Sequence, residues 1–476
     1  NEQRHVLIAG FRRLIFFMTA RKFVSADIPS KRIEGHSRAC ATVVAEVLGK
    51  TLLEKRPADR SLASLFHQNR QLGARDRRII SETLFSVLRW WGWLRYLAPP
   101  EFTDALAAGA PEAPPSLLHH WYGCFAAAWF LEGRGELPPS VNWWLYQAGI
   151  PRQRIKDAAA AAPLRERRRC LKGFYADGET LPPFPVEALL PDWSQGEIAC
   201  PRPLTELIEW LQKRPPVWLR AQTRDVDRLC GELTKADIKV ERHARMNNAL
   251  SISFSGLNLR TLPAFAEGRF EIQDLASQTV AQLCSPQPGE QWWDACAGGG
   301  GKTLHLAWLM GGKGSVMATD IRLHKLQELK LRARRAQFPN IRCKEWQGVP
   351  VPRYHKLFHG VLVDTACSCS GTWRRNPDGR WTSTTAELDE FNALQTKLLT
   401  NAADAVMSGG TLVYATCSMF KRENQDVVGQ FLEQHPDFAL APYNCPLTGI
   451  DCDGMQQLWP WDGDCDAMFM AKMRRK

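Results

Sequence analysis

The sequence predicts an α/β fold: a doubly wound, mostly parallel sheet, preceded by a small α/β module and an all-helical region. From residue 270 onward, apolar β-branched runs alternate with helical patterns, which is typical of parallel strands joined by crossover helices. Residues 204–269 alternate helix and strand patterns on a smaller scale. Residues 37–98 carry apolar residues at three- and four-residue spacing, which indicates amphipathic helices.

The N-terminal helices are expected over "SRACATVVAEVLGKTLLEK" and "DRRIISETLFSVLRWWGWLRYL". Ser37 and Asp76 are the expected N-caps, because short oxygen-bearing side chains accept hydrogen bonds from free helix amides. We expect a helical domain over residues 31–165 and a proline-rich linker over residues 166–203. Residues 1–30 are expected to be an N-terminal extension, and the sequence leaves open whether it is native.

Composition favours an anionic partner. The chain has 476 residues, more than one domain usually holds, and a net charge of +11, which suggests nucleic acid. Its 14 cysteines show no repeated pair at metal-ligand spacing, so we predict no metal site and a reducing, cytoplasmic location. The apolar runs are too short to span a bilayer. We expect a monomer that binds RNA and neither DNA nor a membrane.

A glycine-rich turn, "DACAGGGGKT" over residues 294–303, joins a predicted strand to a predicted helix. Glycines allow close approach of a ligand to the backbone, and the helix N-terminus offers free amides. Asp320 ends the next strand, where an acid about twenty residues after such a turn accepts ribose hydroxyls. A phosphate-binding P-loop is the alternative, but it needs glycine where Cys296 stands, and it leaves the cysteines described next unexplained.

Two thiols follow the ends of two later strands. Cys367 comes three residues after Asp364, at the end of "VLVD", and Cys417 follows "TLVYAT". Buried thiols usually only pack. If the two strands are neighbours, however, both thiols face one crevice beside an acid, which favours chemistry at the carboxyl edge of the sheet. Arg374 and Arg375 are candidates for the positive charge that would lower a thiol pKa.

The glycine turn, "VLVDTACSCSGTWRRNPD" and "YATCS", in this order, resemble the Nop/Sun-type RNA cytosine-5 methyltransferases. Within that family the chain is most similar to the bacterial enzymes that methylate small-subunit ribosomal RNA and carry a NusB-like N-terminal domain. "PPVWLRAQ" resembles their small RNA-binding module, and "FEIQDLASQ" resembles the segment that opens their catalytic domain. The resemblance implies a NusB-like domain over residues 31–165, an RNA-binding module over residues 204–269 and a Rossmann-like methyltransferase domain over residues 270–476.

The resemblance also implies S-adenosylmethionine as cofactor and 5-methylcytosine as product. It assigns Cys417 as the nucleophile that attacks carbon 6 of cytosine, Asp364 as the acid that stabilises the adduct, and Cys367 as the thiol that assists product release. Ribosomal RNA is the expected substrate and transfer RNA the second choice. The implied cofactor contacts are Cys296, Ala297, Gly298, Gly299, Gly300, Gly301, Lys302, Asp320 and Asp364.

Three arginines, Arg220, Arg374 and Arg375, are expected to contact RNA, with support from the basic segments 152–172 and 322–337. Two other function classes remain open at this point. A P-loop NTPase would bind nucleotide and magnesium, and a non-catalytic ribosome-assembly factor would use only its basic surface.

The sequence departs from the family pattern at several places, and these bear on cofactor affinity more than on the catalytic acid and thiols. Thr365 and Ala366 stand where the family usually has Ala-Pro, and Cys369 stands where it usually has glycine. Gly298 replaces a usual proline, and Gln347 stands near the place of an acid that contacts the adenine end of the cofactor.

Overall fold

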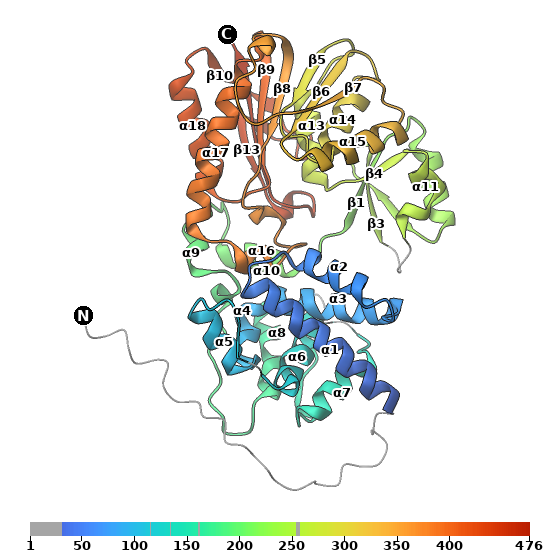
Figure 1. The fold of residues 1–476 in the computed structure, drawn as a ribbon, viewed down its shortest axis with the longest axis vertical. Helices are drawn as coiled ribbons and strands as arrows, with labels where there is room; N and C mark the ends of the chain where they lie inside the picture. The colour runs from blue at the N-terminus through green and yellow to red at the C-terminus, as the bar shows by residue number, and fades with distance from the viewer. Residues whose placement is uncertain (1–30, 115, 134, 160–161, 254–257) are drawn as a thin grey trace, which may run out of the picture.

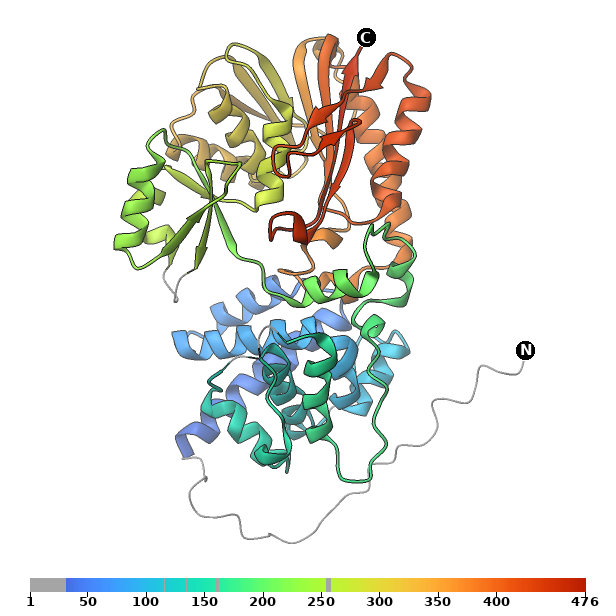
Figure 2. The same ribbon diagram turned by 180° about the vertical axis from the view of Figure 1, so that it is seen from behind.

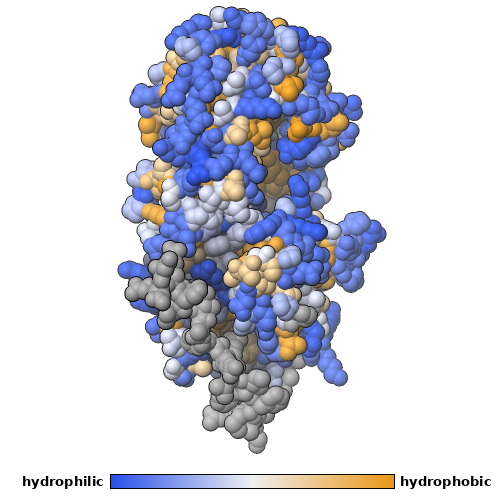
Figure 3. Space-filling model, turned by 60° about the vertical axis from the view of Figure 1, so that its left-hand side comes forward, coloured by the Kyte–Doolittle hydropathy of each residue, from blue (hydrophilic) through white to orange (hydrophobic). Residues whose placement is uncertain are grey.

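The structure is a computed structural model, and it describes residues 31–114, 116–133, 135–159, 162–253 and 258–476. The expected extension over residues 1–30 therefore lies outside the described residues. A helical unit occupies one end of the molecule, a large sheet flanked by helices the other, and a small sheet lies beside the large one (Figures 1 and 2). The face seen in Figure 3 is largely hydrophilic, with hydrophobic residues scattered over it. Within the described ranges, no helix has the length and apolar character needed to cross a membrane.

Aromatic side chains fill the core of the helical unit. Trp90, Trp93, Trp143 and Trp144 are all buried in one cluster, because large apolar rings gain most from leaving water. The helices are α1 (Lys31–Leu52), α2 (Ala58–Gln68), α3 (Ala74–Arg89), α4 (Trp91–Leu94), α5 (Pro100–Ala107), α6 (Tyr122–Glu132), α7 (Pro139–Gln147), α8 (Leu164–Cys170), α9 (Asp192–Gln195) and α10 (Leu204–Gln212).

Both N-cap predictions are wrong in position. Ser37 lies inside α1, where it is buried and its hydroxyl donates to the carbonyl oxygen of Ile33 at 2.6 Å. The cap of α3 is Gly73, and the Asp76 carboxylate, three residues on, accepts from its amide at 2.8 Å. Asp76 therefore stabilises the first turn of α3 from within the helix, where a negative charge is favoured by the free amides.

The helical unit extends further along the chain than the predicted boundary at residue 165. Cys170 and Leu171, in the expected linker, are fully buried in its core, and so are Leu207 and Leu211 of α10. The basic segment 152–172 is not one helix, because its middle carries Pro163 and only its end forms α8. Apolar residues between the prolines thus anchor the segment that the composition suggests is a loop.

The small sheet has the strand order β2-β3-β1-β4, and all its pairings are antiparallel. Its last strand, β4, is the "FEI" that the resemblance assigns to the start of the catalytic domain, yet it pairs with β1. The small module therefore ends after residue 272 rather than at 269. Its elements are β1 (Val217–Ala221), α11 (Val226–Lys235), β2 (Lys239–Arg242), β3 (Ala249–Ser253), α12 (Pro263–Ala266) and β4 (Phe270–Ile272).

The large sheet confirms the predicted doubly wound α/β fold. Its strand order is β10-β14-β9-β8-β5-β6-β7, with β13 paired to β14, and β5 to β9 are parallel. The chain order reverses between β5 and β8, which is where ligands bind in such sheets. The strands are β5 (Gln291–Asp294), β6 (Ser315–Asp320), β7 (Ile341–Glu345), β8 (Phe358–Asp364), β9 (Val406–Thr416), β10 (Phe438–Leu440), β13 (Met455–Leu458) and β14 (Met468–Arg475).

Helices cover both faces of this sheet (Figure 1), and the inner strands β8 and β9 each carry a buried apolar run, as strands covered on both faces do. A separate pair, β11 (Tyr443–Asn444) and β12 (Asp451–Cys452), forms a short ribbon. The helices are α13 (Leu275–Cys284), α14 (Gly301–Leu309), α15 (Leu323–Arg335), α16 (Gly379–Thr382), α17 (Thr385–Ala403) and α18 (Gln425–Gln434).

The chain that follows Cys367 anchors the large sheet to the helical unit. Arg380 of α16 is fully buried and donates to the carbonyl oxygens of Arg89, Leu189 and Leu211. Its neighbour Trp381 donates through Nε1 to the carbonyl oxygen of Leu88 at 2.6 Å. Burial of a charged group is costly unless it is hydrogen bonded, so these contacts hold Arg380 in place, and the helical unit fixes one end of the loop that carries Cys367 and Cys369.

Candidate functional site

Three carboxylates mark the carboxyl edge of the large sheet. Asp294 ends β5, Asp320 ends β6 and Asp364 ends β8, so two of the three flank the point where the chain order reverses. Asp294 is fully buried, and its Oδ2 accepts from the Thr303 hydroxyl at 2.6 Å. Burial raises the pKa of Asp294 to about 7. Its Oδ1 has no hydrogen-bond partner among the described residues, so this buried oxygen remains available to a donor on a ligand.

The two predicted thiols meet at the same edge. The strands that precede them, β8 and β9, are parallel neighbours with Asp364 opposite Ala415, and the Sγ atoms of Cys367 and Cys417 lie 3.4 Å apart. The loop is held by Gly371, whose amide donates to the carbonyl oxygen of Cys417 at 2.9 Å. A Cβ atom at Gly371 would lie 2.1 Å from the Ala467 carbonyl oxygen, so this close approach requires glycine.

A third thiol joins them. Cys369 has a φ of +56°, in the left-handed region that favours glycine, and its Sγ donates to the carbonyl oxygen of Cys367 at 3.4 Å. The Sγ atoms of Cys367, Cys369 and Cys417 all lie within 4.8 Å of one another. Cysteine spacing along the sequence does not indicate this cluster, because its members come from two different strand ends.

Hydrogen bonds within the cluster redistribute its charge. Bonds with Cys367 and Cys417 lower the pKa of Cys369. A hydrogen bond with Cys367 lowers the pKa of Cys417. A hydrogen bond with Cys369 and burial both raise this pKa, and together they outweigh the first effect, so the pKa of Cys417 is raised overall. The charge of Lys302 also acts to lower the pKa of Cys417, a role for which the sequence suggests Arg374 and Arg375. Among the three thiols, Cys369 is therefore the one whose pKa the cluster lowers.

Lys302 and Asp364 form an ion pair beside the thiols. The Nζ atom of Lys302, from the first turn of α14, lies 2.6 Å from Oδ2 of Asp364. Burial raises the pKa of Asp364, and the charge of Lys302 offsets this only in part. A carboxyl group whose pKa is raised exchanges a proton more readily near neutral pH, so Asp364 is suited to hydrogen bonding at a weakly basic ring nitrogen.

Glu423 is a buried acid that the sequence does not single out. It lies in the 3₁₀ helix Lys421–Glu423, and its carboxylate accepts from the amide of Ser368 at 2.8 Å and from the hydroxyls of Ser368 and Ser418. Ser368 follows Cys367 directly and Ser418 follows Cys417. Glu423 thus holds the residues next to both thiols, which makes it a positioning residue. The serine directly after each cysteine is the signal from which it could have been found.

The glycine turn fits a nucleoside-containing cofactor. Gly298 and Gly300 have φ values of +53° and +87°, and a Cβ atom at Gly300 would lie 2.4 Å from Leu329, so the turn can run close to α15 only with glycine. The Gly298 amide donates to Oδ2 of Asp320 at 2.9 Å, which fixes this carboxylate at the turn. The predicted cofactor residues Cys296, Ala297, Gly298, Gly299, Gly300, Gly301 and Lys302 all lie between the end of β5 and the first turn of α14.

Asp320 is paired with Arg322 in the structure. Oδ1 of Asp320 accepts from Nε of Arg322 at 2.9 Å, and about half of the Arg322 side chain is exposed. Burial raises the pKa of Asp320, but the bonds from Arg322 and Gly298 outweigh it, so that the net pKa is lowered. A ribose that binds Asp320 must therefore displace the mobile end of Arg322, whereas the backbone bonds to the carboxylate can remain. Gln347, which the resemblance places near the adenine end of the cofactor, donates to Glu345.

Two of the three predicted RNA contacts need correction. Arg220 is fully buried and donates to Oε1 of Gln273 at 2.7 Å, and burial lowers its pKa to about 9. Arg374 is also fully buried and donates to Asp464 at 2.6 Å. Neither guanidinium is exposed to solvent, and that of Arg374 joins distant segments through the carbonyl oxygens of Lys213 and Cys465. Arg375 is 45% exposed and pairs with Asp466, so it remains a candidate.

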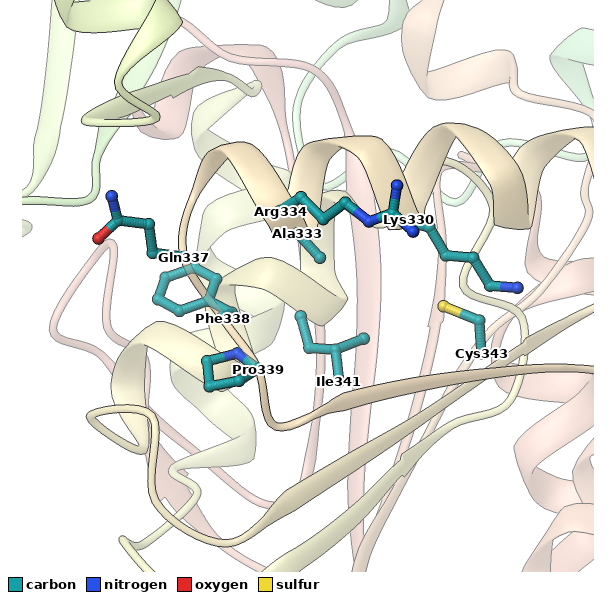
Figure 4. A pocket seen from close by; sticks show the side chains of 8 residues that line it. All are labelled: Lys330, Ala333, Arg334, Gln337, Phe338, Pro339, Ile341 and Cys343. Atoms are coloured by element: carbon teal, nitrogen blue, oxygen red, sulfur yellow. The ribbon is translucent and has the colours of Figure 1, made fainter.

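Two cavities lie at different places relative to the carboxyl edge of the large sheet. A cavity of about 490 Å³ lies between α15 and β7 and is lined by none of the predicted site residues (Figure 4). A second, of about 320 Å³, lies where the three units meet, and its lining includes Arg89, Arg214, Arg374 and Arg375. Arg214 is 42% exposed and is a basic residue at this junction that the sequence analysis does not identify.

Comparisons with known proteins agree with this arrangement. The family described as "16S rRNA methyltransferase RsmB/F" matches residues 281–474. Ribosomal RNA small subunit methyltransferase B of Yersinia pestis bv. Antiqua (strain Angola) is 32% identical over 293 residues, which are 60% of this chain and 67% of that protein. The chain thus spans about two thirds of the length of this curated relative.

Solved structures share the fold. The crystal structure of PH0851 superimposes with a TM-score of 0.71 at 23% identity and covers 94% of this chain and 100% of that one. The structure of NSun6 from Pyrococcus horikoshii with SFG has a TM-score of 0.51 at 18% identity, over 57% of this chain and 93% of that one. With the sequence matches, the catalytic-edge geometry and this shared fold, the chain belongs to the RsmB/F methyltransferase family.

Proposed function

We propose that the protein transfers a methyl group from S-adenosylmethionine to carbon 5 of a cytosine in ribosomal RNA, through a covalent bond between Cys417 and the base. The observation that carries the proposal is the 3.4 Å approach of the Cys367 and Cys417 sulfurs beside the partly buried Asp364. A binding protein would gain nothing from two thiols and an acid at the ligand-binding edge of the sheet. Family membership supports the reaction class.

The covalent step answers a chemical difficulty. Carbon 5 of cytosine is a poor nucleophile, and addition of the Cys417 thiolate to carbon 6 moves the electrons of the double bond to carbon 5. The bound cofactor supplies an electrophilic methyl group, which carbon 5 can then accept. Attack requires that the partly exposed Cys417 thiol lose its proton, which passes to solvent. The charge of Lys302 favours the resulting anion on Cys417.

Asp364 and Cys367 serve different stages of this sequence. Asp364 hydrogen bonds ring nitrogen 3, where negative charge develops when the thiolate adds, and such stabilisation is largest in a water-excluded site. After methyl transfer, the carbon 5 proton must leave, and its bonding electrons restore the double bond and expel the Cys417 thiolate. The Cys367 sulfur lies 3.4 Å from that of Cys417, so Cys367 is placed to accept this proton and assist the elimination.

RNA binding is the second part of the proposal. The target base must leave its stack to reach the acid and thiol at the edge of the sheet, which costs a few kcal/mol and favours loops or unfolded RNA. Arg214 and Arg375 lie at the junction of the three units and are both partly exposed. Ribosomal RNA is preferred over transfer RNA because of the substrate named for the curated relative.

The direct test uses S-adenosylmethionine labelled in its methyl group. The protein is incubated with unmodified small-subunit ribosomal RNA or transfer RNA, and the labelled nucleosides are identified after digestion. We expect label in 5-methylcytidine from ribosomal RNA. Label in transfer RNA alone would show that transfer RNA is the substrate. Label in another nucleoside would overturn the cytosine-5 assignment. If no label is incorporated and the protein releases phosphate from a nucleotide, the NTPase alternative is favoured.

Asp320→Ala is expected to remove most of the thermal stabilisation that S-adenosylmethionine gives. A ligand at a hundred times its Kd stabilises the folded state by about 2.7 kcal/mol, and the ribose contact is lost in this variant. Arg322→Ala is the matched control, because it removes the partner of Asp320 and leaves the carboxylate free for ribose. Scanning calorimetry with and without cofactor measures both. An equal shift in Asp320→Ala would contradict the ribose assignment.

Charge reversal of Arg165, Arg168 and Arg169 is expected to weaken binding to different RNAs alike. All three are exposed on α8, whereas Arg167 between them is buried and donates to the Leu131 carbonyl oxygen. Phosphate contacts release counterions, so the loss of three should flatten the log-log salt slope by about 2. The triple change to lysine keeps the charge and should retain the slope. A slope near zero in the unmodified protein would show that these arginines are ordinary solvated surface.

A further inference from the structure

We propose that Cys367, Cys369 and Cys417 form a binding site for a thiophilic divalent metal ion of the zinc class, which occupies the nucleophile when it binds. The spacing of the 14 cysteines predicts no such site, since no pair repeats at ligand spacing. The fold creates the site by bringing the ends of β8 and β9 together. The protein carries three sulfurs there, although the two-thiol reaction proposed above uses only two.

The sulfur positions suit direct coordination. Zinc–sulfur bonds are about 2.3 Å, so three thiolates on one tetrahedral ion lie about 3.8 Å from one another. The Cys367 and Cys417 sulfurs are 3.4 Å apart, and all three lie within 4.8 Å of one another. Small side-chain rotations therefore bring all three to bonding distance, without movement of the strands.

The backbone aims Cys369 at the other two. Its left-handed conformation directs the Sγ atom back toward Cys367, where it donates to the carbonyl oxygen at 3.4 Å. Glycine would adopt this backbone with less strain than any side chain, so the turn itself does not explain a cysteine. The loop is also held from both sides, by Glu423 through Ser368 and by the close approach of Gly371 to Cys417.

The site is open on one side. Cys369 is exposed, whereas Cys367 is buried and Cys417 is partly buried, so an ion can enter from solvent and reach the inner sulfurs through the outer one. Three protein ligands with a fourth position left to water form a regular zinc arrangement. Binding replaces the thiol protons that remain in the cluster, and these protons pass to solvent.

Metal binding and methyl transfer compete for the same atom. An ion that holds the Cys417 sulfur prevents its attack on cytosine, so zinc is expected to inhibit the enzyme reversibly. This consequence rests on the proposed function, whereas binding itself does not. A failure of methyl transfer would leave a direct binding measurement interpretable, and the two can be judged separately.

The test uses Cd²⁺ as an optical probe and Zn²⁺ as its competitor, on the full chain, in a phosphine reductant that keeps all thiols reduced. We expect one Cd²⁺ per chain with a thiolate-to-cadmium charge-transfer band, and displacement of that band by Zn²⁺. Cys369→Gly should bind Cd²⁺ at least tenfold more weakly at this site, and its backbone preference keeps the loop folded. Cys452→Ala, which removes a half-buried thiol of the β11–β12 ribbon, is the matched control and should retain the band.

Equal cadmium affinity and band intensity in Cys369→Gly would overturn the proposal, because the third ligand would then contribute nothing. Loss of the band in Cys452→Ala would overturn it as well, because the ion would then lie elsewhere. A second measurement compares the rate of methyl transfer by each protein in the presence of zinc with the rate of the same protein without metal. Zinc should inhibit the unmodified protein at concentrations at least tenfold lower than those that inhibit Cys369→Gly, and a chelator should restore the rate.

Discussion

Cys417→Ala is expected to lower the rate of methyl transfer by about 10⁴-fold or more, the size of effect that follows removal of a catalytic nucleophile. Without the thiolate, carbon 5 of cytosine keeps its low nucleophilicity and no covalent bond to the RNA forms. The glycine turn and Asp320 lie on other strands, so binding of cofactor and RNA should persist. Incorporation of labelled methyl groups measures the rate, and denaturing gels with labelled RNA detect the adduct.

Cys452→Ala is the control for loss of a thiol, since Cys452 lies in the β11–β12 ribbon, outside the thiol cluster. It should methylate at the rate of the unmodified protein. Methyl transfer by Cys417→Ala at an undiminished rate would show that the reaction proceeds without a covalent bond to this residue. Weaker cofactor binding in the variant would instead indicate that the alanine disturbs the site, which calorimetry with cofactor would reveal.

The sequence predicts those site residues that lie at the ends of strands. Asp364, Cys367 and Cys417 follow apolar β-branched runs, and in a parallel sheet the carboxyl ends of all strands meet at one edge. Neighbouring order in the sheet was the missing step, and the pairing of β8 with β9 supplies it. The alternation of strand and helix patterns thus predicts which residues reach the edge, because it shows where each strand ends.

Long-range packing accounts for what the sequence does not predict. The sequence suggests that Arg220 and Arg374 are basic surface residues, yet each is buried by segments that lie far away in the chain. The positions of charged residues along one sequence carry no information on such burial. The same limit applies to Glu423, whose contacts lie 5 and 55 residues away. The strand β4 pairs with β1 of the small sheet, a partner that an isolated apolar triplet does not specify.

Cys367→Ala is expected to accumulate protein covalently bonded to RNA. Cys417 and the ion pair of Lys302 with Asp364 remain, so attack and methyl transfer should proceed. Elimination should then stall, because the thiol that lies 3.4 Å from the Cys417 sulfur is gone and the carbon 5 proton leaves slowly. A denaturing gel should show labelled RNA as a slow band that protease removes, and the band should carry label from the methyl group of S-adenosylmethionine.

The neighbouring thiol provides the comparison that makes this result specific. Cys369→Ala removes a sulfur from the same cluster but keeps Cys367, so it should accumulate no adduct. The double variant Cys367→Ala, Cys369→Ala should trap at least as much adduct as the single variant, since no thiol then remains to assist release. If Cys417→Ala is the variant that accumulates adduct, the roles of the two cysteines are exchanged. If neither variant traps RNA while both continue to methylate it, then neither sulfur bonds to the base, and the 3.4 Å approach of the two thiols serves packing alone.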